Sequence, residues 1–89
     1  MSWKPVNGLA LNLAGATKHA DHDVWTGFGR HSAATGMVNV YDDLYETPAG
    51  RWFVCRAHRE QDEAAWFELT AEQAAEWLAK VAAAPERMY

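Results

Sequence analysis

The chain contains one cysteine, Cys55, among its 89 residues. An intramolecular disulfide is therefore excluded, as is usual for proteins of reducing compartments. The sequence also lacks an apolar run of about 20 residues, which a membrane-spanning helix would need. No basic segment followed by an apolar stretch opens the chain, so a secretory signal peptide is not predicted. These absences predict a cytoplasmic protein that does not enter a membrane.

An excess of positive charge is also lacking. The chain has 8 basic and 12 acidic residues, and its net charge is −4. A general nucleic-acid binder needs a basic stripe that neutralises phosphates, so nucleic acid is not favoured as the partner. Alanine is abundant and arginine outnumbers lysine, which is typical of a high-GC bacterial source. We predict no bound cofactor and no bound metal.

Aromatic residues, by contrast, are numerous, with five Trp, three Phe and three Tyr. A chain of this length forms one domain, here residues 1–89, and buries roughly 60–65% of its unfolded surface. Each buried aromatic side chain removes about 150–250 Å² from water, so a few of them can form a small core. Those that remain exposed suit a contact surface.

Residues 36–84 organise the fold. The segment Thr47-Pro48-Ala49-Gly50 predicts a hairpin turn, because proline pre-sets φ and glycine tolerates a positive φ. Strands are predicted on both sides, from residue 37 to 46 and from 51 to 57, and a third strand over 65–69. The pair Asp42-Asp43 interrupts the apolar alternation of the first strand, and we expect a β-bulge there.

A helix is predicted over residues 71–84. Thr70 and Gln73 have the spacing of a capping box, and Pro85 is placed to end the helix. The apolar residues on its buried side recur at i, i+3, i+4, i+7 and i+8, as Ala74, Trp77, Leu78, Val81 and Ala82.

The residues before the hairpin give weaker patterns. Residues 1–8 are predicted to be irregular, 9–13 and 18–26 to be strands, and 26–32 to be a loop. The predicted fold class is therefore α+β, with an antiparallel sheet of four to five strands, built as a meander, packed by one C-terminal helix.

The two sheet faces are predicted to differ. Phe53, Phe67 and Leu69 are assigned to the core, against Trp77 and Leu78 of the helix. The opposite face is a candidate partner-binding surface, unless the N-terminal segment with Trp3 covers it. Its predicted members are Asp42, Asp43, Tyr45, Arg51, Trp52 and Trp66.

The resemblance to known proteins rests on two segments, Asp43-Leu44-Tyr45-Glu46-Thr47-Pro48-Ala49-Gly50-Arg51-Trp52-Phe53 and Phe67-Glu68-Leu69-Thr70-Ala71-Glu72-Gln73-Ala74-Ala75-Glu76-Trp77-Leu78. They resemble a group of small bacterial proteins of unknown function, found in chromosomes and mobile elements, that share the layout LYxTxxGxWF…LTxEEAxxWL. Gln73 stands where this layout has its second Glu. The resemblance covers roughly residues 9–80. It implies a turn, a helix cap and aromatic positions, and no catalytic residue.

Four local clusters have a chemical interpretation and a structural one. His19 and His22 could hold a metal with a nearby carboxylate, or belong to a solvated polar segment. Asp42-Asp43 could act as an acid/base pair, although adjacent carboxylates on a strand point apart, or could blunt a sheet edge. The structural interpretation is preferred for both clusters.

Cys55 could be a nucleophile beside His58, but three residues apart on a strand they face opposite sides, which favours a buried thiol. Gly27-Phe28-Gly29 with Arg30 could cradle a phosphate, but no strand–loop–helix context surrounds it, which favours an ordinary loop.

The sequence therefore predicts a non-enzymatic protein-interaction module, such as a mobile-element adaptor or an inhibitor of the anti-CRISPR kind. Its partner would be another protein or a second copy of the chain. A small metal-dependent enzyme and a single-stranded nucleic-acid binder on the aromatic face are the alternatives.

Overall fold

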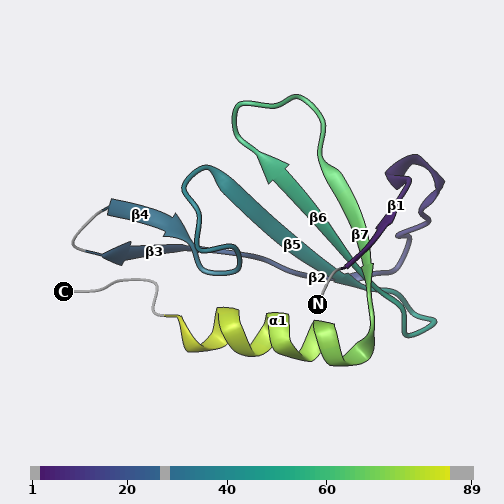
Figure 1. The fold of residues 1–89 in the computed structure, drawn as a ribbon. Helices are drawn as coiled ribbons and strands as arrows, with labels where there is room; N and C mark the ends of the chain where they lie inside the picture. Colours follow the sequence, from purple (N-terminus) through teal and green to yellow (C-terminus); the bar gives the residue numbers. More distant parts are fainter. Residues whose placement is uncertain (1–2, 27–28, 85–89) are drawn as a thin grey trace.

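The fold is a five-stranded antiparallel sheet with one helix across it, together with a small two-stranded sheet (Figure 1). The computed structural model describes residues 3–26 and 29–84. The large sheet has the order β1-β7-β6-β5-β2, and the small one pairs β3 with β4. The bounds are β1 Lys4–Val6, η1 (a 3-10 helix) Gly8–Ala10, β2 Thr17–His19, β3 Asp23–Thr26, β4 Gly29–Ser32, β5 Val40–Glu46, β6 Trp52–His58, β7 Ala65–Leu69 and α1 Ala71–Ala83. The predicted α+β class with a meander and a C-terminal helix is confirmed.

The hairpin turn forms as predicted. Gly50 has a φ of 83° and donates its amide hydrogen to the Thr47 carbonyl at 2.9 Å. Beyond the turn, β5 and β6 pair one to one from Glu46 opposite Trp52 to Val40 opposite His58. The predicted β-bulge is therefore wrong. The apolar alternation of β5 is interrupted for another reason: the charged side chain of Asp42 points into the core.

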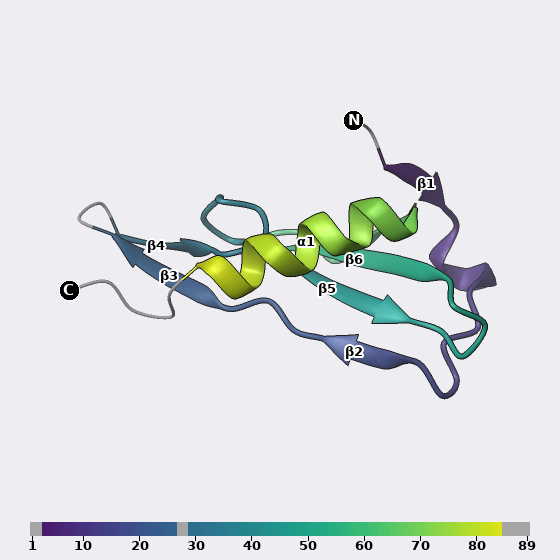
Figure 2. The ribbon, with the colours of Figure 1, turned by 90° about the horizontal axis from the view of Figure 1, so that it is seen from below.

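The helix begins at its predicted cap. The Gln73 amide donates to the Thr70 hydroxyl at 3.2 Å, and the Thr70 amide donates to the Gln73 side-chain oxygen at 2.9 Å. Viewed from below, α1 lies across β5 and β6 (Figure 2). The helix ends at Ala83. Pro85, which was expected to end it, lies outside the described residues.

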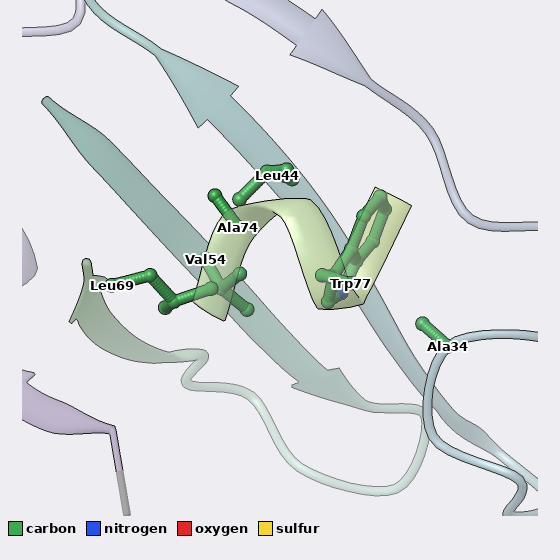
Figure 3. Close-up of a cluster of buried hydrophobic side chains, with 6 residues drawn as sticks. All are labelled: Ala34, Leu44, Val54, Leu69, Ala74 and Trp77. Atoms are coloured by element: carbon green, nitrogen blue, oxygen red, sulfur yellow. The ribbon is translucent and has the colours of Figure 1, made fainter. Parts of the chain in front are cut away.

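The core lies between α1 and the sheet. Leu44 and Val54 face each other across β5 and β6 and have no exposed surface. Figure 3 shows the helix above them, with Ala34 contributed by the turn after β4. The cluster consists of Ala34, Leu44, Val54, Leu69, Ala74 and Trp77. Burial of these side chains is the main force holding α1 on the sheet.

Phe53 is buried, as predicted, but the prediction that it shares the helix side of the sheet is wrong. Phe67 pairs with Val54, and Leu69 pairs with Trp52, so these residues and not Phe53 share the helix side of the sheet. Because β6 is apolar on both faces, its sequence could not decide which face meets the helix. Phe53 is buried on the opposite face.

The segment before the hairpin departs most from the predictions. Residues 4–6 form edge strand β1, where a proline is tolerated, and 8–10 form a 3-10 helix instead of part of a strand. The predicted strand 18–26 is divided into β2 and β3, and the predicted loop 26–32 contains β4. Asn39 has a φ of 63°, so the strand predicted from residue 37 begins only at Val40. Gly27 and Phe28 lie outside the described residues.

Candidate functional site

The face of the sheet opposite α1, here called the open face, is the candidate interaction surface. Three cross-strand rows build it. Lys18, Tyr45, Phe53, Glu68 and Lys4 form one row, and Asp43, Cys55, Trp66 and Val6 form the next. Tyr41 and Ala57 form the third. Strand alternation places all of these side chains away from the helix.

Two aromatic side chains lie at the centre of the open face. The rings of Tyr45 and Trp66 are 5.6 Å apart and tilted by 36°. Both side chains are half-buried. Ring pairs at this separation are favourable and rigid, so part of each ring is available for contact without much loss of entropy.

The N-terminal segment covers one end of the open face. A Cβ atom on Gly8 would lie 2.1 Å from Cδ1 of Trp66, so the backbone of Gly8 rests directly on the indole ring. Residues 10–12 and 14 then line a depression together with Phe53 and residues 47–49 of the turn. Trp3 lies elsewhere, since it packs edge-on against Phe67 on the helix side, with ring centroids 5.7 Å apart. The segment thus crosses the sheet edge, with Trp3 on one face and Gly8 on the other.

The six predicted contact residues are divided between the two faces. Asp43, Tyr45 and Trp66 lie on the open face, together with Arg51, whose guanidinium lies 5.1 Å from the Phe53 ring. Asp42 and Trp52 lie on the helix side, and Asp42 is fully buried. The prediction that Asp42 and Trp52 lie on the contact face is wrong. Because β5 and β6 pair without a bulge, Asp42 keeps the same side of the sheet as Leu44.

The net charge of the open face is opposite in sign to the net charge of the whole chain. Among the described residues, five of the chain's eight basic side chains lie on this face or at its edge near Tyr41, and they are Lys4, Lys18, Arg30, Arg51 and Arg59. Four carboxylates accompany them: Asp23 near Arg30, Asp43 near Lys18, Glu68 near Arg51, and Glu63, which lines a depression with Trp66. The open face therefore carries a positive excess in a chain whose net charge is −4.

The rim of the open face is held by ion pairs. Arg51 donates to both carboxylate oxygens of Glu68, at 3.0 and 2.9 Å, and these bonds lower the pKa of Glu68. The Tyr41 hydroxyl donates to Asp23, which raises the pKa of Tyr41. Near this bond lies Trp25 of β3, which is 42% exposed. The Arg30 guanidinium lies over the Trp25 ring, 5.3 Å from the ring centroid.

Beneath α1 lies a buried polar cluster that the sequence patterns did not reveal. Asp42 accepts from Nε and Nη2 of Arg56 at 2.8 and 3.0 Å, and the Trp77 indole N–H is 3.4 Å from the same carboxylate. These bonds raise the pKa of Arg56. Counting outward from the turn would have placed Asp42 opposite Arg56, beside Leu44 and Val54, so the signal was present in the sequence.

Asp21 has a structural role. Its carboxylate accepts from the amides of His22, Ala34 and Asp42 at 2.8, 3.0 and 3.0 Å, and from the Ser32 hydroxyl. The carboxylate takes the place that a continued β2 would occupy beside β5, which explains why the predicted strand 18–26 is interrupted.

The two histidines of the predicted metal cluster have different surroundings. The ring of His19 lies 6.0 Å from that of Trp52, and its buried Nε2 has no partner among the described residues. The Nε2 of His22 lies 3.1 Å from the carbonyl oxygen of Ala84. Within residues 3–26 and 29–84, no three His, Cys, Asp or Glu side chains gather closely enough to hold a metal ion.

Cys55 lies on the open face between Asp43 and Trp66, whereas His58 pairs with Val40 on the helix side. They therefore point to opposite faces, as the strand spacing predicted. Burial, followed by the nearby carboxylates of Asp43 and Asp42, raises the pKa of the Cys55 thiol. A raised pKa lowers the thiolate fraction at neutral pH, which disfavours a nucleophile.

Comparison of the chain with protein-family models, with curated proteins and with solved structures finds no match. No residue role is therefore transferred from another protein. The described part of the chain contains no helix long and apolar enough to cross a bilayer.

Proposed function

We propose that this protein is a non-enzymatic interaction module, an adaptor or inhibitor, that binds another protein through its open face. The observation that carries this proposal is the Tyr45–Trp66 ring pair, which lies on a sheet face that α1 leaves uncovered. Tyr, Trp and Arg are the residues on which binding energy concentrates in protein interfaces. The principal extents of 40 × 27 × 26 Å leave room for a standard contact of roughly 800 Å² per partner.

The charge of the open face favours a partner that is acidic around an apolar centre. The face carries five cations against four carboxylates, whereas the rest of the chain is strongly acidic. A second copy docked face to face would bring this positive excess against itself, so a different protein fits better. Because Lys18, Arg30 and Arg51 each have a carboxylate nearby, the face offers few cations to a phosphate backbone, and nucleic acid is the weaker candidate.

A binding measurement with matched charge reversals tests this proposal. Affinity capture from a bacterial lysate supplies candidate partners, and each is then purified and titrated by calorimetry. Arg59→Glu at the edge of the open face should weaken binding about tenfold or more, whereas Lys80→Glu on α1 makes the same charge change on the other side and should leave the affinity unchanged. Trp25→Ala should also weaken it, because an exposed aromatic contact is lost.

Three results would contradict the proposal. The first is binding that Lys80→Glu weakens and Arg59→Glu does not. The second is sedimentation showing a homodimer that open-face variants dissociate. The third is a gel shift with single-stranded DNA at low salt, which would favour the nucleic-acid alternative because low salt maximises the phosphate contribution.

A further inference from the structure

A cleft of about 300 Å³ lies on the other side of the molecule, between α1, the turn after β4 and Trp3. This volume is at the lower end of the range of small-ligand sites. The residues that give it its chemistry are Trp3, Met37, Arg56, Trp77, Lys80 and Glu76. The cleft shares none of these residues with the open face, so its interpretation does not depend on the proposed function.

The guanidinium of Arg56 is held rigidly at this cleft. Asp42 engages its Nε and Nη2, and the ring of Trp3 lies 4.9 Å from Cζ. Nη1 takes no part in these bonds and has no partner among the described residues, and 27% of the side chain is exposed. A guanidinium fixed in this way loses little entropy when it donates to a ligand, and a planar carboxylate is the acceptor it fits best.

Lys80 and Met37 extend the site in two directions. Lys80 lies three residues after Trp77 on α1 and lines the same cleft, and no described residue forms an ion pair with it. Asp42 already offsets the charge of Arg56, so Lys80 supplies the positive charge that an anion would meet. Met37, which is 44% exposed, and the half-buried ring of Trp3 provide apolar surface beside these donors, while Trp77, which also lines the cleft, is only 4% exposed.

We infer that the cleft binds a carboxylate attached to an apolar group. The carboxylate is held by Arg56 Nη1 and Lys80, while the apolar part lies against Met37 and Trp3. The same chemistry is offered by a free small carboxylic acid and by the C-terminus of a peptide that ends in an apolar residue. Glu76 also lines the cleft, and its negative charge should reduce the affinity for either ligand.

The test is titration of the ¹⁵N-labelled protein followed by NMR, with four probes. Two carry the carboxylate: 3-phenylpropionate and acetyl-Gly-Phe with a free C-terminus. Two are their matched neutral forms: 3-phenylpropanol and acetyl-Gly-Phe amide. The inference predicts saturable shifts of the Trp77 indole N–H and the Arg56 Nε–H with at least one carboxylate probe, and weaker binding of its neutral form. The acid that binds more tightly identifies the source of the carboxylate.

Surface variants keep the test independent of folding. Lys80→Gln should weaken carboxylate binding about fivefold, and Glu76→Gln should strengthen it by a similar factor, since each changes one charge close to the bound anion. Arg59→Glu on the open face should change nothing. Equal binding of the acid and neutral forms, no saturable shift with either acid, or no effect of Lys80→Gln would each overturn the inference.

Discussion

The carboxylate of Asp42 and the guanidinium of Arg56 form a two-bond ion pair, at 2.8 and 3.0 Å, in which the carboxylate has no exposed surface. The Trp77 indole N–H is 3.4 Å from the same carboxylate and connects the pair to α1. A charge buried to this degree is tolerated only when its hydrogen-bond partners are in place.

Loss of Arg56 should be more severe than loss of Asp42. We expect Arg56→Met to lower the free energy of unfolding by about 3–5 kcal/mol, because it leaves the fully buried Asp42 carboxylate unpaired. Asp42→Leu should cost less, because the Arg56 side chain is 27% exposed and its charge keeps contact with water. The double variant Asp42→Leu/Arg56→Met should cost much less than the sum of the two. Urea denaturation of the four proteins measures this coupling, and simple additivity would show that the pair does not act as a unit.

Gly8 should tolerate no side chain. Gly8→Ala places a methyl group 2.1 Å from Cδ1 of Trp66, so the N-terminal segment must lift from the open face, at a cost of about 1–3 kcal/mol. In a Trp66→Ala background the ring is absent, and the same change should cost less than about 1 kcal/mol. Thermal unfolding of the wild type and the three variants checks this, and an equal cost in both backgrounds would refute the contact.

His19 is a place where a substitution should stabilise the fold. Its buried Nε2 lacks a partner among the described residues, and leaving such an atom unsatisfied costs about 1–3 kcal/mol. His19→Leu removes the polar atom and keeps apolar contact with Trp52, so we expect a gain of about 1 kcal/mol in unfolding free energy. His58→Leu, at a half-buried histidine on the same side of the sheet, is the control and should give no gain.

The Arg51–Glu68 pair should make the free energy of unfolding depend on pH. Hydrogen bonds from Arg51 lower the pKa of Glu68 in the folded protein, so the stabilisation is present above the unfolded pKa of about 4.3 and is lost as the pH falls through the folded value. At pH 7 the wild type should be slightly more stable than Glu68→Gln, and the difference should vanish once the pH has fallen below the lowered pKa of Glu68 in the folded protein.

Urea denaturation of both proteins at several pH values measures this difference. Glu60→Gln, which changes an exposed residue of a turn, is the control. Its unfolding free energy should equal that of the wild type at each pH measured. A difference between wild type and Glu68→Gln that persists in acid would show that the pair acts through packing and not through charge.

The elements predicted correctly are those whose signal is local. The turn at 47–50 needs only proline and glycine at two positions, and the capping box needs only Thr70 and Gln73. Most of the buried stripe of α1 follows from helical spacing, and Trp77 is 4% exposed as that spacing requires. Ala82, predicted on the same stripe, is exposed. Such signals act over a few residues and are not overridden by the rest of the fold.

The errors concern residues whose state depends on distant partners. Strand β6 is apolar on both faces, so only its pairing with β7 decides that Val54, and not Phe53, meets the helix. Residues 9–13 alternate like a strand, but β1 already pairs with β7 and the following segment packs on Trp66 as a 3-10 helix. For the candidate site, the sequence correctly grouped Asp43, Tyr45, Arg51 and Trp66, and it misplaced Asp42 and Trp52.

The sequence by itself determined the α+β class, the meander of β5, β6 and β7, and the capped helix, because short-range backbone preferences and side-chain periodicity specify them. Only the tertiary structure decided which sheet face α1 covers, that Asp42 is buried with Arg56, and that the N-terminal segment places Trp3 on one face and Gly8 on the other. These outcomes depend on contacts between residues far apart in the chain, where burial of one surface competes with burial of another, and no local pattern records the result of that competition.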